Sequence, residues 1–322
     1  MNIPRIRFAH LPTMIEPMPR LTALLGGPQL FIKRDDQTGL GMGGNKTRKL
    51  EFVLAQALAE GAKTLITVGG IQSNHCRQTA ALAAKYGLKC TLVLSGSEPQ
   101  NPNGNLLLDN LFGASIIWTT REKRDETLQK AFEDSKRGGD QPFLIPLGAS
   151  TPTGALGYVD AMQELKEQGN DYQWIIVASS SAGTQAGMVL GASLTGFSGR
   201  ILGISIDHPV NELQASVAQI ANGAAGLLRE KKRFKPDEIL VNADYLGAGY
   251  AIAGVGEYEA IRLFAENEGL LLDPVYTSRA AAGMIDLIRQ GFIKASEKIL
   301  FWHTGGASAL FASPYAEEIA SR

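Results

Sequence analysis

The sequence predicts an α/β fold with two open parallel sheets, and two observations predict it. Short β-branched runs alternate with helical patterns along the 322 residues, which is typical of repeated strand–helix–strand units. Several runs, such as LIT, IIV and ILF, are apolar on both faces, as expected for parallel strands covered by helices. The expected strands are 30–33, 64–68, 91–94, 115–119, 143–147, 174–178, 201–206 and 299–303.

Two glycine-containing segments indicate where one part of the chain ends and the next begins. They are GLGMGG at 39–44 and LGASTPTGALG at 147–157, and four of the expected strands lie between them. We therefore predict a smaller α/β domain over 50–156 and a larger domain made of 1–49 together with 157–322. The polar segments 97–106 and 228–238 are predicted to be loops without a site.

The composition is that of an ordinary globular enzyme or binding protein. A net charge of -1 gives no basic surface for nucleic acid, and no apolar run is long enough to cross a membrane. The N-terminal residues lack the apolar core of a signal peptide. The two cysteines, Cys76 and Cys90, have no metal-type spacing and make a poor disulfide framework, so we expect no metal site and a cytoplasmic protein.

A lysine stands between the first glycine segment and a helix. Residues 50, 53, 54, 57 and 58 are apolar at helical spacing, so a helix is expected directly after the glycines. A cation is disfavoured at a helix N-terminus, and Lys46 lies there. The glycines are expected to let this loop approach a ligand closely.

Three further motifs follow an expected strand and open a helix, which is where open parallel sheets bind ligands. In VGGIQSNHCRQ, at 68–78, Ser73 or Asn74 is either a simple helix cap or part of a pocket for a carboxylate. In ASSSAGTQAG, at 178–187, small residues form either a phosphate cradle or a close strand–helix contact. In ILFWHTGGA, at 299–307, His303 is more commonly a packed residue than a catalyst.

A phosphate cradle combined with a lysine beside a glycine loop indicates pyridoxal phosphate. That cofactor requires an amine for covalent attachment, a phosphate site and a group facing its ring nitrogen. Partial desolvation near positive backbone N–H groups lowers the pKa of a lysine and makes it nucleophilic, which accounts for the position of Lys46. The glycines would then give the loop room against the cofactor ring.

The segments GGNKTRKLE, GGIQSNHCRQTAA, SAGTQAG, LLDPVYTSRAAAGM and HTGGASALF resemble the pyridoxal-phosphate enzymes of the tryptophan-synthase-β fold, or fold type II. More narrowly, they resemble the branch with D-cysteine desulfhydrase, L-cysteate sulfo-lyase and 1-aminocyclopropane-1-carboxylate deaminase. The resemblance runs from about residue 8 to residue 312. It implies a homodimer that binds a small amino acid as substrate.

The resemblance also implies a role for each matching residue. Lys46 would hold the cofactor covalently and take the α-proton of the substrate, with Ser73 and Tyr276 beside it at the catalytic centre. The other cofactor-binding residues would be Asn74 at the ring hydroxyl, Ser181, Ala182, Gly183 and Thr184 at the phosphate, and Thr304 at the ring nitrogen. The substrate-binding residues would be Gln72, Ser73, Asn74, His75, Tyr250, Tyr276 and Thr277.

One departure from the family pattern separates its branches. The deaminase has Tyr-Glu where this chain has Tyr276-Thr277, and a carboxylate there would keep the ring nitrogen protonated. Hydroxyls at 277 and 304 give a weaker electron sink, which suffices for β-elimination of a sulfur group. We therefore expect a lyase for D-cysteine, with L-cysteate close behind. A sulfonate would need cationic partners or several hydrogen-bond donors, for which His75, Arg279 and His303 are conceivable. The deaminase and a non-catalytic amino-acid-binding protein are the remaining alternatives.

Overall fold

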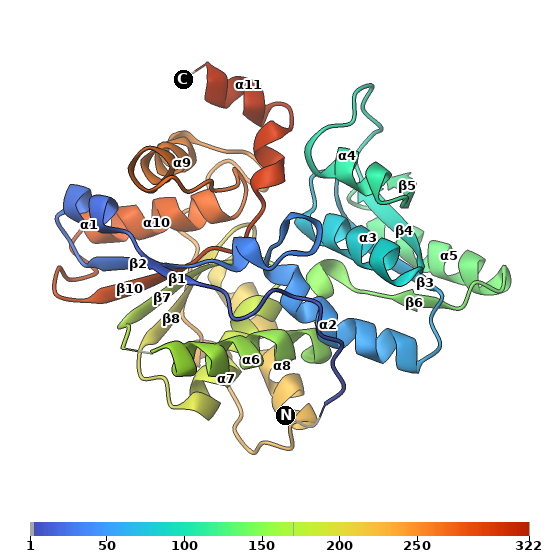
Figure 1. Ribbon diagram of the computed structural model, residues 1–322, viewed down its shortest axis with the longest axis horizontal. Coiled ribbons are helices and arrows are strands. Elements are labelled where there is room, and N and C mark those ends of the chain that lie inside the picture. The colour runs from blue at the N-terminus through green and yellow to red at the C-terminus, as the bar shows by residue number, and fades with distance from the viewer. Residues whose placement is uncertain (1–2, 170, 322) are drawn as a thin grey trace.

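The computed structural model describes residues 3–169 and 171–321, which form two sheets flanked by helices (Figure 1). The larger sheet has the strand order β1-β2-β10-β7-β8-β9, and all its pairs are parallel except β1 with β2. Its strands are β1 (Ile15–Pro17), β2 (Gln29–Lys33), β7 (Trp174–Ser179), β8 (Arg200–Ser205), β9 (Val241–Asn242) and β10 (Lys298–Trp302). Residues 1, 2, 170 and 322 of the predicted larger domain lie outside the described residues.

The smaller sheet is parallel throughout and has the order β5-β4-β3-β6. Its strands are β3 (Thr64–Gly70), β4 (Lys89–Ser95), β5 (Ser115–Thr119) and β6 (Pro142–Leu144). The predicted α/β class with two parallel-sheet units is confirmed, and all eight expected strands are present. The strand expected over 143–147 ends at Leu144 instead, and β1 and β9 are short edge strands that were not expected. The domain boundaries at 49/50 and 156/157 stay a prediction.

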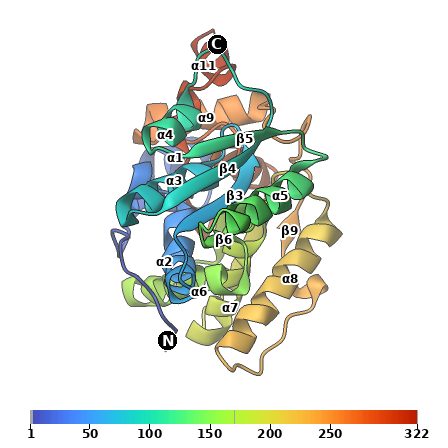
Figure 2. The same ribbon diagram turned by 90° about the vertical axis from the view of Figure 1, so that its right-hand side faces the viewer.

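Helices cover both faces of each sheet, as the doubly apolar strands require. On the larger sheet α1, α9 and α10 pack on one face and α6, α7 and α8 on the other (Figure 1). On the smaller sheet α5 packs on one face, and α3 and α4 belong to the opposite layer (Figure 2). The helices are α1 (Pro19–Leu25), α2 (Asn45–Ala59), α3 (Asn74–Tyr86), α4 (Gly104–Leu111), α5 (Arg124–Arg137), α6 (Pro152–Gln168), α7 (Gly183–Thr195), α8 (Val210–Leu227), α9 (Val255–Glu268), α10 (Thr277–Arg289) and α11 (Tyr315–Ala320). No helix among these residues is long and apolar enough to cross a membrane.

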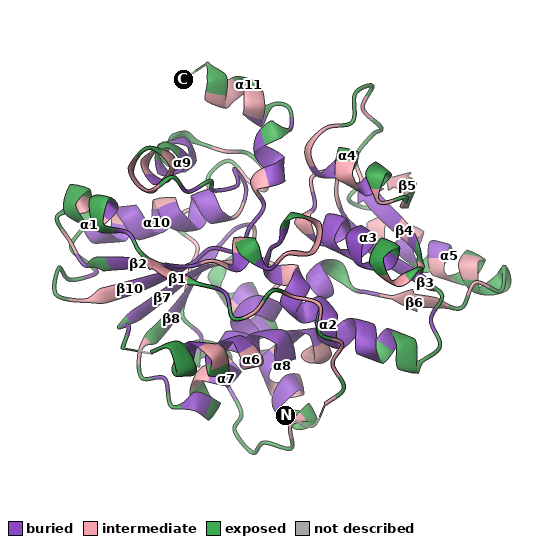
Figure 3. Ribbon diagram, in the orientation of Figure 1, coloured by how far each residue is buried: buried purple, intermediate pink, exposed green. Residues whose placement is uncertain are grey.

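Helix α2 lies between the layers of the two sheets and is buried along most of its length (Figure 3). Leu50 and Leu54 belong to the apolar cluster of the smaller sheet, whereas Phe52 packs with Leu156 of α6. The helix expected after the glycines is therefore present, and it contacts both halves of the fold. Leu58, which the apolar pattern included, is 39% exposed because it lies near the end of the helix.

The glycine segment ahead of α2 packs against the protein itself. Gly43 and Gly44 have φ values of +68° and +124°, in the region that favours glycine. A Cβ at Gly43 would lie 2.0 Å from the carbonyl oxygen of Asp36, and one at Gly44 would lie 3.1 Å from that of Thr304. The expectation that these glycines make room for a ligand is wrong, because none of them lines the cavity described below. They allow two backbone segments to touch.

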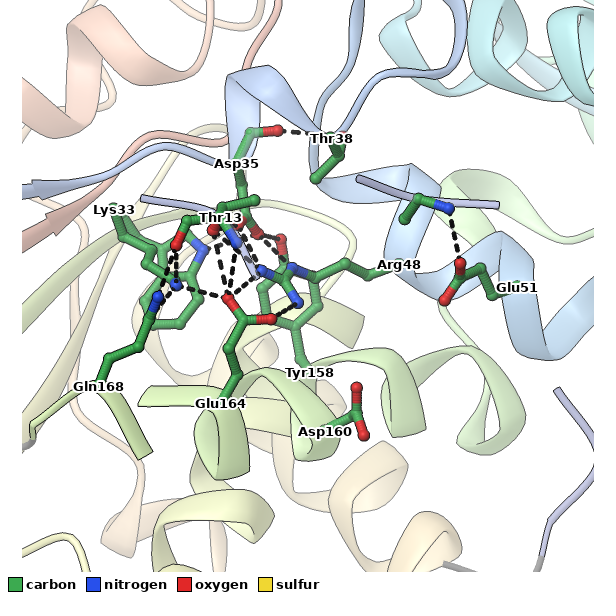
Figure 4. Close-up of polar contacts among 12 residues, drawn as sticks. Thr13, Lys33, Asp35, Thr38, Arg48, Glu51, Tyr158, Asp160, Glu164 and Gln168 are labelled. Carbon is green, nitrogen blue, oxygen red and sulfur yellow. Dashed lines mark hydrogen bonds and ion pairs between the residues drawn. The ribbon is translucent and has the colours of Figure 1, made fainter. Parts of the chain in front are cut away.

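A buried ionic cluster fixes the first turns of α2 (Figure 4). The guanidinium of Arg48 makes paired hydrogen bonds at 2.9 Å to Asp35 and to Glu164 of α6. Tyr158 and Trp302 donate to Asp35 at 2.6 and 2.8 Å, and Lys33 pairs with Glu164. Burial opposes the charge of Asp35, but Arg48 outweighs it and holds the pKa of that carboxyl below its usual value. Two cations thus balance two carboxylates in a region without solvent.

Replacing Arg48 with methionine is expected to lower the free energy of unfolding by about 3–5 kcal/mol, because Asp35 would stay buried without its ion-pair partner and Glu164 would keep only Lys33. Equilibrium unfolding in urea measures the change. The matched control is Arg137→Met, which removes a surface ion pair with Asp134 and should leave the stability nearly unchanged. Equal midpoints for the two variants would show that the cluster does not hold α2 in place.

Candidate active site

A cavity of about 610 Å³ lies where the carboxyl ends of the two sheets face each other. Its wall combines the ends of β3, β4, β5, β7 and β8 with the starts of α2, α3 and α7. The site residues predicted from the sequence that line it are Lys46, Ser73, Asn74, His75, Ser181, Ala182, Thr184, Tyr250, Tyr276 and Thr304. Gln72, Gly183 and Thr277 do not line it. No group of three or more His, Cys, Asp or Glu side chains among the described residues could hold a metal ion.

Lys46 is the second residue of α2, and its side chain reaches the cavity. Its amine forms no hydrogen bond with any described residue. Burial lowers the pKa of Lys46 to about 8, and the negative charge of Asp273 only partly opposes this shift. A lysine with this pKa is partly neutral near pH 8, which is the form that attacks a carbonyl group or accepts a proton.

The turn before α7 presents hydroxyl groups to the cavity. Thr184 Oγ1 accepts a hydrogen bond from Asn45 Nδ2 at 3.0 Å, and Ser181 Oγ accepts one from Ser150 Oγ at 2.8 Å. Both hydroxyl protons are therefore available to a ligand, together with the free backbone N–H groups of the first turn of α7. Ala182 has φ +66°, an uncommon value for a residue with a side chain, and such strain is found most often at binding sites.

A second buried lysine lies behind this turn. Lys49 Nζ donates to Gly148 O and to Ser150 Oγ, both at 3.2 Å, and forms no ion pair with a described carboxylate. Burial, reinforced by the charge of Lys46, holds its pKa well below the usual value. A Cβ at Gly183 would lie 2.8 Å from the backbone Cα of Ser150, so this position requires glycine, and Lys49 Nζ would be equally close to it. Two buried amines and a helix N-terminus thus lie around one turn, and neither amine forms an ion pair with a described carboxylate, which fits a phosphate dianion.

The turn before α3 presents an amide and a hydroxyl. Ser73 caps the helix by accepting from Cys76 N at 3.2 Å, as the capping interpretation of this motif predicts. Asn74 Oδ1 accepts from Asn105 Nδ2 at 2.9 Å, which orients the amide so that its NH₂ group is the free donor. That donor lies near the backbone of Gly306, where a Cβ would come within 2.6 Å of it.

Two residues predicted to bind substrate are engaged elsewhere. The Gln72 amide accepts from Asn105 N at 2.7 Å and donates to Asn103, so it fixes the start of α4. Thr277 is fully buried, and its hydroxyl exchanges two hydrogen bonds of 2.7 Å with Asp273. Both side chains support the walls of the cavity from behind, because their hydrogen bonds direct them into the protein.

Histidine 75 lines the cavity as a neutral acceptor. Thr67 Oγ1 donates its proton to Ile145 O at 2.7 Å, so His75 Nε2 must donate to that oxygen across 2.8 Å. The unprotonated Nδ1 is then buried without a partner among the described residues. Burial, followed by the charges of Lys46 and Lys49, holds the pKa of His75 well below its ordinary value.

Two tyrosines and a threonine complete the wall opposite the smaller sheet. The hydroxyls of Tyr250 and Tyr276 are 2.6 Å apart, and their rings meet edge to face. Burial raises the pKa of Tyr250 to about 12 and holds that of Tyr276 well above its usual value, so both stay protonated. Thr304 lines the cavity, and its carbonyl accepts from Asn45 N at 3.0 Å.

Sequence reasoning missed several residues of the site. Lys49 lies three residues after Lys46 on the same helix, and that spacing could have indicated that both amines share a face. Arg121 and Arg124 line the cavity just beyond β5, at the kind of strand end where ligands bind. Ser97 also lines it, although 97–106 was predicted to be a loop without a site, and α4 begins within that segment at Gly104.

Both cysteines lie outside the cavity wall. Cys76 and Cys90 are free and buried. Burial is the largest cause that raises the pKa of the Cys76 thiol well above its usual value and that of Cys90 to about 12. Neither thiol is therefore available as a nucleophile in the described structure.

Comparison with known proteins gives one family and several similar structures. Residues 6–305 match the family described as pyridoxal-phosphate dependent enzyme. A crystal structure described as an ACC deaminase homologue is 37% identical, with a TM-score of 0.91 over 99% of this chain and 96% of its own. The processed form of threonine deaminase isoform 2 from Solanum lycopersicum is 16% identical, with a TM-score of 0.69 over 96% of this chain and 82% of its own. An L-serine ammonia-lyase from Rhizomucor miehei is 18% identical, with a TM-score of 0.69 over 98% of this chain and 99% of its own. The last two show the fold alone.

The lowered pKa of Lys46 is expected to appear in its reactivity. In ligand-free protein, acylation of Lys46 should rise with pH around a midpoint of about 8, because the neutral amine is the reacting form. Free lysine in the same tube, whose amine titrates near 10.4, serves as the reference. Peptide mass mapping after brief exposure to acetic anhydride measures the labelled fraction. A midpoint that coincides with free lysine would contradict the buried setting of this amine.

Proposed function

This chain belongs to the pyridoxal-phosphate-dependent enzyme family, and we propose that it is a carbon–sulfur lyase that performs β-elimination on a small amino acid. The first candidate substrate is D-cysteine, which would give pyruvate, ammonia and sulfide. The observation that carries the proposal is that neither of the two positions that separate the family's branches gives the cavity a carboxylate. Thr304 lines the cavity, and Thr277 lies outside its wall and is bound to Asp273.

The residues present fit the cofactor pyridoxal 5′-phosphate. Its phosphate would bind at Ser181 and Thr184 on the N-terminus of α7, with the amine of Lys49 behind the turn, where a bound anion would favour its protonated form. Lys46 would hold it covalently, Asn74 would donate to its ring oxygen, and Thr304 would face its ring nitrogen. When bound, the cofactor withdraws electrons from the α-carbon of an attached amino acid and so makes the α-hydrogen acidic.

The chain's own groups would bind the substrate and move its proton. Ser73 and the N–H groups at the start of α3 suit the substrate carboxylate, because a helix N-terminus favours an anion. Lys46, with its pKa of about 8, is suited to take the α-proton near neutral pH. Tyr276, paired with Tyr250, stays protonated and would keep a hydrogen-bond donor beside the departing sulfur group.

The cyclopropane deaminase is the weaker candidate for this site. One similar structure is described as an ACC deaminase homologue, which shows that the overall fold suits that branch too. Position 277, however, has no carboxylate here, and the hydroxyl at Thr304 gives a weak partner for the ring nitrogen. Opening a ring that has no α-hydrogen depends more on a protonated nitrogen than β-elimination does.

L-Cysteate stays the second candidate substrate. The three cations that the sequence suggested as partners for its sulfonate do not fill that role. His75 is neutral, and His303 makes hydrogen bonds to the backbone outside the cavity. Arg279 pairs with Glu257 at 2.7 Å and donates to the carbonyls of Ile206 and Ile252. None of the three offers a free positive charge to a sulfonate.

Replacing Ser181 and Thr184 together with alanine is expected to weaken cofactor binding by about 1–3 kcal/mol, because charge-assisted hydrogen bonds to the phosphate would be lost. Activity should return in excess cofactor. Titration of apoprotein with pyridoxal phosphate, followed by visible absorbance, measures the affinity. Ser193→Ala, an exposed change on the same helix, is the control. An unchanged affinity in the double variant would mean that the phosphate binds elsewhere.

The choice of reaction is tested by the product. We expect pyruvate from D-cysteine or L-cysteate and little or no 2-oxobutanoate from 1-aminocyclopropane-1-carboxylate. Coupled assays for the two oxo acids compare the rates, and Lys46→Ala should abolish both. If 2-oxobutanoate forms as fast as pyruvate from any sulfur substrate, the deaminase replaces the lyase as the better assignment. If no oxo acid forms although the cofactor binds, the protein is a binder and not an enzyme.

A further inference from the structure

The cavity extends beyond the residues that the proposed reaction uses. Its outer end is formed after the carboxyl ends of β4 and β5, by Ser95, Gly96, Ser97, Thr119, Thr120, Arg121 and Arg124. We infer that this outer end is an anion subsite, and that the preferred substrate carries a second anionic group on its sulfur-bearing side chain. The inference rests on the proposed function, because it assigns a substrate class to the same site.

The position of the subsite suits a group at the far end of a side chain. Strand β4 separates β3 from β5, and neighbouring strands lie about 4.8 Å apart, so the ends of β3 and β5 are about 10 Å apart. Ser73, which follows β3, is the proposed partner of the α-carboxylate. A cysteine thiol extends only a few ångströms from the α-carbon, so free cysteine would leave the outer end to solvent. An arginine side chain at the outer end is long enough to extend toward Ser73 or to meet a substituent on the sulfur of a longer substrate.

Positive charge dominates the cavity wall. Its charged residues among those described are Lys46, Arg121 and Arg124 against a single carboxylate, Asp207. With Lys46 committed to the cofactor, the two arginines are the cations that remain for a substrate. A guanidinium group stays charged at all relevant pH values and matches a planar carboxylate or a sulfonate with two parallel donors.

Most hydrogen-bond donors of Arg121 and Arg124 are unused. Arg121 forms no hydrogen bond or ion pair with a described residue, and Arg124 uses only Nε, which meets Asp125 Oδ1 at 3.0 Å. The Asp125 side chain is 81% exposed, so water screens most of its effect on Arg124. The two guanidinium groups thus line the outer end of the cavity with most of their donors unused.

A matched pair of substrates tests the subsite. S-(2-carboxyethyl)cysteine and S-(2-carbamoylethyl)cysteine have the same size and differ in one negative charge. Elimination breaks the Cβ–S bond, releases the substituent as a thiol, and the remaining three-carbon fragment takes up water to give pyruvate and ammonia. Both enantiomers of each compound are assayed for pyruvate, with D-cysteine and L-cysteate alongside.

We expect kcat/KM for the carboxyethyl compound to exceed that for the carbamoylethyl compound by about tenfold or more, the effect of a charge-assisted hydrogen bond. The double variant Arg121→Gln/Arg124→Gln should lose this preference. Lys123→Gln removes a charge from the same loop at a residue that does not line the cavity, and it should keep the preference. A parallel loss with L-cysteate would show that the arginines also reach a short anion.

Equal kcat/KM values for the charged and neutral compounds, or a preference that survives in the double variant, would overturn the subsite. Absence of pyruvate from every compound would instead overturn the proposed function. In that case the subsite is still tested by calorimetry, which measures how tightly the two S-substituted compounds bind to the wild type and to the double variant. Tighter binding of the carboxylate that disappears in the double variant supports the subsite, and equal binding rejects it.

Discussion

The ionic cluster of Lys33, Asp35, Arg48 and Glu164 is the interaction on which the rest of the site depends. Removing four charges from water is costly, and only a fully hydrogen-bonded arrangement offsets that cost. The arrangement has a single geometry, since Arg48 binds both carboxylates through paired bonds and Asp35 also accepts from Tyr158 and Trp302. It joins the first turns of α2 to α6 and to the larger sheet. Asn45, Lys46 and Lys49 lie on those same turns, so their placement follows from a cluster that has no contact with the ligand.

The cavity selects its ligands by charge. Buried amines, two guanidinium groups and the N-termini of α3 and α7 all favour anions, and Asp207 is the one carboxylate among the described lining residues. A phosphate, an α-carboxylate and a distal acidic group would each meet a different part of this field. The proposed reaction also requires a base at pH 7 to 8, and burial, which Asp273 opposes only in part, is what gives Lys46 a neutral fraction there.

The strand positions, the Ser73 cap and the turn before α7 could be predicted from the sequence because each depends on local pattern. Apolar runs, small residues at strand ends and capping side chains keep their meaning whatever the tertiary structure. The directions of Gln72 and Thr277 could not be predicted, since Asn105 and Asp273, which bind them, are identified only by the folded chain. The role of the glycines before α2 was predicted wrongly for the same reason. Glycine indicates close approach but not the approaching atom, which here is the backbone at Asp36 and Thr304.

The two buried thiols have a consequence for redox behaviour. Thiol–disulfide exchange requires a thiolate that can reach its partner, and both Cys76 and Cys90 are buried with raised pKa values. A protein proposed to release sulfide or other thiols thus keeps its own sulfur atoms out of exchange with its product. Neither thiol of the folded chain is therefore placed to form a mixed disulfide. A thiol reagent that modifies either cysteine therefore reports that the smaller sheet and its helices have opened.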